Sequence, residues 1–137
     1  MINMIIDATN TILGRLASTT AKKILSGEDV IIINAEKSVI TGKKKMVFER
    51  FKHKRERGDP KNGPFYPRYP DMILRRVIRG MLPYKKAKGR AALKRLRVYN
   101  GNPENFKKIQ KIIKSSEELE CKYMTLEELS RRMGAKV

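Results

Sequence analysis

The residues best suited to chemistry in this chain are its arginines and lysines, and the chemistry that they suit is phosphate binding. Residues 43–97 hold 20 Lys and Arg against four acidic residues, within a 137-residue chain of formal net charge +18. Arginine forms paired hydrogen bonds with phosphate oxygens, and lysine neutralises phosphate as a point charge. A merely solvated surface would intersperse acids among these cations. Residues 43–97 therefore predict a surface for a polyanion, with nucleic acid as the leading candidate.

Two groups of side chains are the predicted RNA contacts. The first group contains arginines, which can also stack on bases: Arg75, Arg76, Arg79, Arg90, Arg95 and Arg97. The second group adds the exposed charge around them: Lys43, Lys44, Lys45, Lys52, Lys54, Arg55, Arg68, Lys85, Lys86 and Lys88. Some of the arginines are expected to pair within the fold instead. A membrane surface is a weaker alternative, because the chain has no Trp to anchor an amphipathic helix.

A phosphotransfer or nucleotidyl enzyme would need motifs that this sequence does not complete. The segment 41–43 (Thr-Gly-Lys) is similar to part of a P-loop, but Lys37 stands at the position of the first glycine and Lys44 at that of the hydroxyl residue. The turn after the first predicted strand offers only Gly14, so it lacks a dinucleotide fingerprint. His53 is the only histidine and stands in a basic run, which favours a surface or RNA-facing position.

Asp7 and Glu36 are the one hint of an acidic pair, because they follow predicted strands at the edge where α/β sites lie. Helix capping or an ion pair with Arg15 is the interpretation that we favour. Cys121 is the only cysteine, so it forms no internal disulfide and no zinc set, and it is expected to be a small buried side chain. The sequence therefore predicts no catalytic residue, no metal site and no cofactor.

The scaffold that carries residues 43–97, from here on called the basic segment, is predicted to begin with a βαβ unit. Residues 4–6 and 30–33 are apolar runs typical of strands, and the second has the pattern of a strand buried on both faces. Between them, apolar residues recur at helical spacing over 12–25. Residues 1–42 carry four basic and four acidic side chains, as expected for a scaffold. This pattern predicts a parallel sheet between helices, with a right-handed connection.

The basic segment is predicted to fold as helices around one long irregular loop. Residues 46–51 give the first helix a single apolar stripe. Residues 58–70 hold four of the six prolines, two glycines and three aromatic residues, which excludes a long helix. We expect this loop to be mobile in the free protein and ordered by a partner. The remainder is predicted to contain a helix over 71–81, a basic turn over 84–90, helical spacing over 91–96 and a strand over 96–99.

Several capping residues are also predicted. Asn10 or Thr11 and Asp71 are the expected N-caps of two helices, and Gly27 lies just past the end of the first. Thr125 with Glu128 forms a capping box for a last helix. Two further elements are a strand over 38–40 and a helix from the apolar stripe over 106–113.

The length fits one domain spanning residues 1–137. The longest apolar runs fall far short of a membrane span, and the N-terminus lacks the pattern of a signal peptide. We therefore expect a soluble protein that stays inside the cell.

Six blocks of this sequence resemble the ribosomal protein L13 family. Three blocks in the basic segment correspond to its signature region: Arg79-Gly80-Met81-Leu82-Pro83, Lys88-Gly89-Arg90-Ala91-Ala92-Leu93 and Leu96-Arg97-Val98-Tyr99-Asn100-Gly101. Three earlier blocks match the same family: Ile6-Asp7-Ala8-Thr9, Leu13-Gly14-Arg15-Leu16-Ala17-Ser18 and Ile33-Asn34-Ala35-Glu36. Residues 123–134 resemble its archaeal and eukaryotic C-terminus, and the lack of an extended eukaryotic tail favours an archaeal source.

The resemblance implies an α/β fold of three layers, α/β/α, with a four-stranded parallel sheet and a basic irregular extension. It implies a structural constituent of the large ribosomal subunit in the cytoplasm, bound to 23S rRNA and neighbouring ribosomal proteins, with no enzyme activity and no obligate homo-oligomer. A regulatory RNA- or DNA-binding module is the competing class. A sequence-specific DNA-binding protein should contain a helix-turn-helix or form a symmetric dimer, and the sequence shows no such signal.

Overall fold

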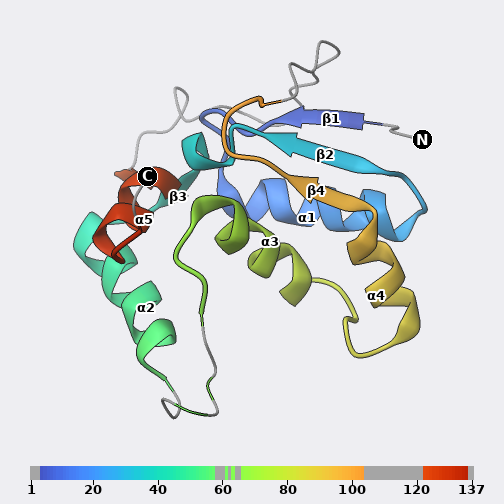
Figure 1. Cartoon of the computed structure of the whole chain (residues 1–137). Helices are drawn as coiled ribbons and strands as arrows, with labels where there is room; N and C mark the ends of the chain where they lie inside the picture. Colours follow the sequence, from blue (N-terminus) through green and yellow to red (C-terminus); the bar gives the residue numbers. More distant parts are fainter. Residues whose placement is uncertain (1–3, 58–60, 62, 64–65, 104–121, 136–137) are drawn as a thin grey trace.

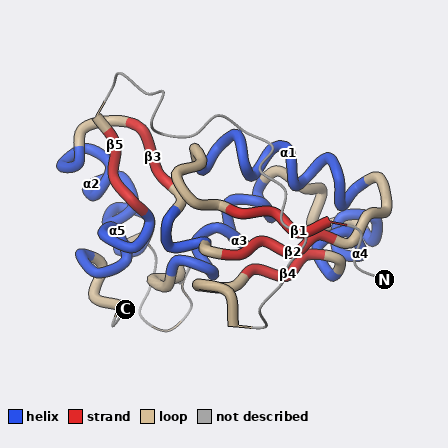
Figure 2. Tube along the Cα trace, turned by 90° about the horizontal axis from the view of Figure 1, so that it is seen from above, coloured by secondary structure: helices blue, strands red, loops and turns tan. Residues whose placement is uncertain are grey.

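A parallel sheet of three strands forms the centre of the fold. The computed structural model describes residues 4–57, 61, 63, 66–103 and 122–135. The strands are β1 (Met4–Asp7), β2 (Val30–Ile33) and β4 (Leu96–Val98), in the order β1-β2-β4 (Figure 2). All four residues of β2 are buried, as their unbroken β-branched run predicts for a central strand. The register aligns Ile32 with both Ile6 and Val98.

Helix α1 (Leu13–Leu25) connects β1 to β2 and packs beneath the sheet. Its buried face is the apolar stripe that the sequence predicts, and Gly27 follows the helix with a positive φ of 103°. The prediction of Asn10 or Thr11 as its N-cap is wrong, because Ile12 occupies that position without a side-chain hydrogen bond. Asn10 instead turns the chain in the left-handed conformation, at φ 57°.

The predicted strand over 38–40 exists but does not join the main sheet as a fourth strand. It spans β3 (Val39–Thr41) and pairs antiparallel with β5 (Tyr123–Thr125), a strand that the sequence analysis did not identify. After β2 the chain turns at Asn34 into the short 3₁₀ helix η1 (Ala35–Lys37), which carries β3 beyond the end of the sheet. One parallel bridge, from the Val39 N–H to the Thr11 carbonyl at 2.9 Å, links β3 to the chain after β1. The four-stranded sheet is therefore not confirmed.

Helices lie on one face of the three-stranded sheet in the part of the chain that the structure describes (Figure 1). The helix predicted over 106–113 lies outside the described residues, as does Cys121. The prediction of a loop over 58–70 falls only partly on described residues, and Tyr66 to Arg68 there form neither helix nor strand.

The basic segment forms three helices below the sheet, from one end of the molecule to the other (Figure 1). They are α2 (Lys44–Glu56), α3 (Pro70–Gly80) and α4 (Ala87–Lys94). Helix α3 packs against α1 and buries Ile73, Leu74 and Ile78. Its N-cap is Tyr69, followed by a proline in the first turn, so the prediction of Asp71 as the cap is wrong.

The last helix, α5 (Leu126–Arg132), packs against β5, η1 and α3. The predicted capping interaction is confirmed, because the Glu128 N–H donates to the Thr125 hydroxyl at 3.3 Å.

Helix α4 begins inside the stretch predicted as a basic turn, and Gly89 explains why it can do so. The turn after α3 brings the Pro83 carbonyl against the backbone of α4, where a Cβ on Gly89 would overlap it. Gly80, by contrast, ends α3 with open space around its Cα. The close approach at Gly89 therefore needs a glycine, and it fixes the position of the basic residues on either side.

Candidate nucleic-acid interface

Most of the exposed side chains among the predicted RNA contacts lie in two groups, towards the two ends of the basic segment. On α2 and at its N-terminus, the side chains of Lys43, Lys44, Lys45, Lys52 and Lys54 are exposed. On the turn after α3 and the first half of α4, the exposed cations are Lys85, Lys86, Lys88 and Arg90. Arg97 is exposed on the edge strand β4. Helix α3 lies between the helices that carry the two groups (Figure 1).

Three of the predicted contacts, Arg55, Arg75 and Arg95, donate to carbonyls at the ends of other helices. Arg95 Nη1 donates to the Ile24 carbonyl in the last turn of α1 at 2.8 Å. Arg75 donates to Leu96 O at 3.0 Å and to Leu93 O, in the last turn of α4, at 3.5 Å. Arg55 donates to the Met133 carbonyl at the end of α5. Helix C-termini leave carbonyls unpaired and attract cations, so these arginines stabilise the fold.

Arg76 and Arg79 lie against tyrosine rings from the segments on either side of α3. The Arg76 guanidinium carbon is 5.7 Å from the centre of the Tyr66 ring, and that of Arg79 is 4.3 Å from the Tyr84 ring. Stacking of this kind restrains the guanidinium plane while leaving in-plane N–H groups available for phosphate. Both arginines are half-buried, so their positions are defined before any ligand binds.

Tyr66 connects the long loop to two helices of the basic segment. Its ring packs edge-on against Phe51 of α2 at 5.9 Å, and the Lys54 ammonium lies 5.6 Å from its centre. Burial raises the pKa of the Tyr66 hydroxyl above its usual value of 10.0, and the Arg76 charge partly opposes that rise. Tyr66 is therefore neutral at physiological pH and acts as a packing residue.

A pocket of about 220 Å³ opens between α3 and α4 beside the two stacked arginines. Its lining combines the three arginines of α3 with apolar side chains: Arg75, Arg76, Arg79, Pro67, Met72 and Leu93. Met72 is 53% exposed although it is apolar.

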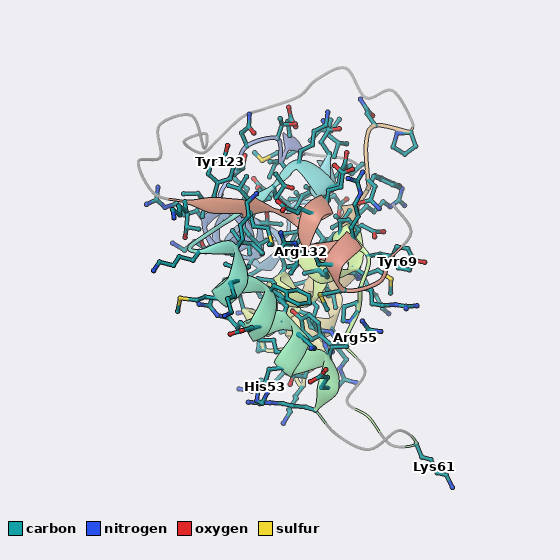
Figure 3. The ribbon with its side chains drawn as sticks, turned by 90° about the vertical axis from the view of Figure 1, so that its left-hand side faces the viewer. His53, Arg55, Lys61, Tyr69, Tyr123 and Arg132 are labelled. Carbon is teal, nitrogen blue, oxygen red and sulfur yellow. The ribbon has the colours of Figure 1, made fainter. Side chains whose placement is uncertain are left out.

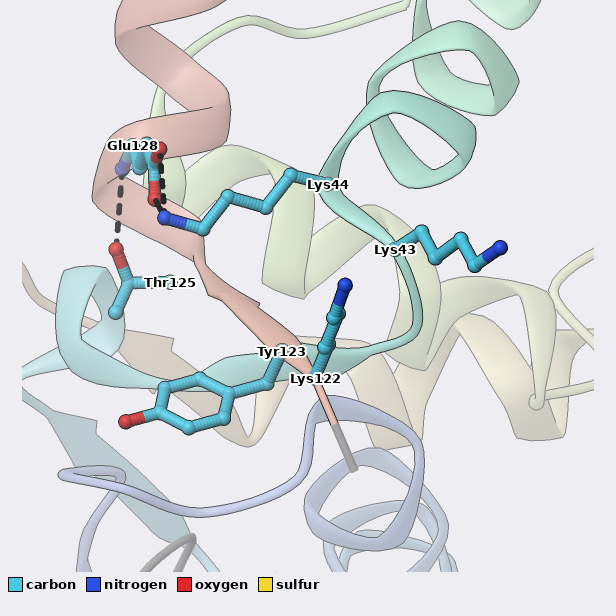
Figure 4. Close-up of a pocket in the computed structure, with 6 residues that line it drawn as sticks. All are labelled: Lys43, Lys44, Lys122, Tyr123, Thr125 and Glu128. Carbon is cyan, nitrogen blue, oxygen red and sulfur yellow. Dashed lines mark hydrogen bonds and ion pairs between the residues drawn. The ribbon is translucent and has the colours of Figure 1, made fainter. Parts of the chain in front are cut away.

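A larger open pocket of about 640 Å³ lies at the N-terminus of α2 (Figure 4). Lys43 and Lys122 border it, and Tyr123 is 41% exposed there. Lys44 and Glu128 line it too, and the Lys44 ammonium lies 3.2 Å from the Glu128 carboxylate. Lys122 was not among the predicted contacts because it lies outside 43–97, and only the pairing of β3 with β5 brings it to α2.

Other residues of α2 face outward or towards α5 (Figure 3). His53 is exposed, as predicted for a surface histidine, and Lys52 forms a 3.9 Å pair with Glu56. A third pocket, of about 310 Å³, lies between α2 and α5, where Arg55 and Arg132 both line it. Lys61 and Arg68 are both exposed, and Lys61 lies beyond the end of α2 in Figure 3.

Asp7 and Glu36 connect the loops at the ends of the parallel strands. Asp7 Oδ1 accepts from the Thr9 N–H at 2.9 Å and from Asn34 Nδ2 at 3.1 Å. Glu36 Oε2 accepts from the Gly101 N–H at 2.9 Å. Helix capping is thus the wrong interpretation for Asp7 at α1, whose N-cap lacks a side-chain hydrogen bond. Among the residues that the structure places, no three His, Cys, Asp or Glu side chains group as metal ligands would.

Comparison with known proteins gives one consistent result. The family model described as ribosomal protein L13 matches residues 2–105. The chain is 52% identical over 136 residues to the large ribosomal subunit protein uL13 of Methanocaldococcus jannaschii, covering 96% of this chain and 98% of the relative. It is 50% identical over 136 residues to uL13 of Methanopyrus kandleri, and 49% over 135 residues to that of Archaeoglobus fulgidus, covering 95% of this chain and 86% of each relative.

Within the described ranges, no helix is long and apolar enough to cross a membrane. The family match covers β1 to β4 and all three helices of the basic segment, and the relatives extend it through β5 and α5. This chain therefore belongs to the ribosomal protein L13 family.

Proposed function

We propose that this chain is a structural constituent of the large ribosomal subunit, where it binds 23S rRNA and supports the folding and assembly of the subunit. The observation that carries the proposal is the near-complete alignment, at about half identity, with proteins named as large-subunit components. The exposed cations of α2, of the turn after α3 and of α4 support RNA as the ligand.

The physical role is to neutralise phosphate repulsion where rRNA segments meet. The deep major groove of A-form RNA is closed to side chains, so backbone and shape contacts dominate over base readout. The proposed contacts are the predicted set, with the exposed lysines and Arg68, Arg90 and Arg97 reaching the RNA directly. Arg55, Arg75 and Arg95 position the helices that carry the others. The chain acts as one copy among neighbouring ribosomal proteins in the cytoplasm, without catalysis.

Sedimentation of a tagged copy from an archaeal lysate tests the proposal. We expect the protein to travel with the large subunit at low salt. A matched variant with Lys43, Lys45, Lys86 and Lys88 replaced by Gln should be incorporated less efficiently, because four exposed charges are lost. A second variant with Lys22, Lys23, Lys37 and Arg15 replaced by Gln loses the same charge outside the basic segment and should be incorporated normally.

Protein that stays at the top of the gradient would overturn the ribosomal assignment. Recovery of the tag on messenger RNA or on DNA, without the large subunit, would instead favour a regulatory nucleic-acid-binding module.

A further inference from the structure

The pocket between α3 and α4 is lined by three arginines, here called its rim, and by the apolar side chains of Pro67, Met72 and Leu93, here called its floor. Phosphate neutralisation alone does not require this combination. We infer that the pocket binds a single unstacked nucleotide of the rRNA, with the base against Met72 and Leu93 and the phosphate on Arg76 and Arg79. The inference rests on the proposed function, since it names the contact that this part of the surface makes with RNA.

The rim is preorganised for a phosphate. Arg76 and Arg79 lie one turn apart on α3, and a tyrosine from outside the helix stacks on each of them. Holding a guanidinium in place before binding reduces the side-chain entropy that a phosphate contact costs. Arg75 supports the same pocket from behind, because its hydrogen bonds to Leu93 O and Leu96 O hold α3 against the end of α4.

The floor suits a planar base. Met72 of α3 and Leu93 of α4 both line the pocket, and Met72 is half exposed to solvent although α3 has buried positions for apolar residues. A thioether side chain adapts its shape and makes favourable contacts with aromatic rings. The pocket of about 220 Å³ is smaller than the ~300–1,000 Å³ of sites for drug-sized ligands, so it has room for one small planar group.

The charge and the floor together favour a nucleotide over the alternatives. An acidic peptide would satisfy the arginines but would leave the apolar floor uncovered, and an apolar peptide would leave the arginine N–H groups without acceptors. A nucleotide in a regular duplex keeps its base stacked inside the helix, whereas unpaired nucleotides in loops and bulges can extend their bases towards a protein. The expected ligand is therefore a nucleotide from such a loop or bulge.

Photo-cross-linking locates the contact. The probe is M. jannaschii 23S rRNA transcribed with 4-thiouridine, bound to the full chain and irradiated, after which the cross-linked peptides are identified by mass spectrometry. We expect a nucleotide remnant on a peptide containing Met72 or Leu93. Cross-links confined to α2 and to the turn after α3 would overturn the pocket while leaving rRNA binding intact.

Affinity measurements with the same rRNA separate stacking from charge. Arg79→Lys keeps the charge but loses the planar group that lies on Tyr84, and Tyr84→Leu removes the ring, so each should weaken binding about tenfold. Tyr84→Phe keeps the ring and should bind more tightly than Tyr84→Leu, whereas Arg15→Lys changes an exposed arginine on α1 and should bind like the original chain. Thermal unfolding of each variant checks that the fold is retained.

Different outcomes would contradict the nucleotide pocket and the proposed function. If Arg79→Lys binds as tightly as the original chain, the pocket does not hold a phosphate and this inference is wrong. If the original chain itself does not bind the rRNA, the proposed function is wrong and the inference falls with it.

Discussion

At the residue scale, arginines of one sequence segment perform two different tasks. Arg95 and Arg97 are two positions apart, yet Arg95 donates to the end of α1 whereas Arg97 is exposed on β4. Arg95 is the C-cap of α4 and has a helical conformation, whereas Arg97 lies within the strand, so the two side chains belong to different elements. The charge of an arginine therefore does not decide its role. The role depends on whether a helix-end carbonyl lies within hydrogen-bond distance.

Replacing Arg95 by Gln should destabilise the fold by about 1–3 kcal/mol, since it leaves the Ile24 carbonyl without its charged donor. Arg97→Gln removes the same charge from an exposed position and should change the free energy of unfolding by less than about 0.5 kcal/mol. Urea denaturation of both variants measures the difference. Equal stability of the two would show that the hydrogen bond to α1 contributes nothing.

Gly89→Ala should lower the stability by about 1–3 kcal/mol, because the new methyl group overlaps the Pro83 carbonyl and the backbone must shift. Gly80→Ala is the matched control: it also adds one methyl to a helix of the basic segment, but into open space. It should be neutral or stabilise by up to about 1 kcal/mol. Calorimetric Tm values distinguish the two, and similar Tm values would refute the close approach at Gly89.

At the scale of elements, stability and RNA affinity are expected to depend on different parts of the fold, the sheet and the basic helices. Ile32 lies at the centre of β2, fully buried and aligned with residues of both neighbouring strands. The exposed cations of α2 and α4 lie outside the sheet, on helices of the basic segment. A defect in the sheet should thus change stability, while a defect in the cations should change RNA affinity.

Ile32→Ala should cost about 2–5 kcal/mol of stability through lost transfer free energy and the cavity that remains. The fraction that stays folded should bind rRNA as tightly as the original chain, because no cation has changed. Thermal unfolding and filter binding on the same samples test both statements. Weak binding by fully folded protein would mean that the sheet itself shapes the RNA surface.

The elements that sequence reasoning predicted well are those with a local apolar pattern. The stripe of α1 and the continuous run of β2 each specify their element from adjacent residues alone. The antiparallel pairing of β3 with β5 was not predicted, because β5 is only three residues long and its partner β3 lies more than 80 positions earlier. The hydrogen bonds from arginines to helix ends were not assigned for a related reason. The sequence shows the cation, but it does not show which helix end the fold brings next to it.

The N-cap errors have a different cause. Ile12 and Tyr69 begin their helices without a side-chain hydrogen bond, so no preferred capping residue marks the position. Asn10 and Asp71, the predicted caps, serve a left-handed turn and a hydrogen bond from Asn100 instead. Of the candidate interface, the sequence located the segment and its charge, and the fold was needed to show which cations are exposed.

At the scale of the whole molecule, the charge distribution predicts how binding should respond to salt. The logarithm of the rRNA affinity should fall linearly with the logarithm of salt concentration, by a slope of ~0.7 to 0.9 for each neutralised phosphate. Replacing Lys43 and Lys45 by Gln should lower that slope by about two contacts. Replacing Lys22 and Lys37 by Gln removes the same amount of charge and should leave the slope unchanged. A flat salt dependence of the original chain would contradict the electrostatic account.

The pairing of β3 with β5 also has a consequence for the order in which a nascent chain can mature. Synthesis proceeds from the N-terminus, so β1, β2 and β4 can assemble as soon as residue 98 is available. Residues 39–41 must wait for 123–125, and until then they present an unpaired strand edge beside the most basic helix. A chain interrupted before Tyr123 would thus carry its RNA-attracting helix without the strand and the α5 carbonyl that hold it in place. Synthesis of residues 123–133 is therefore the step that fixes the position of the basic helix α2.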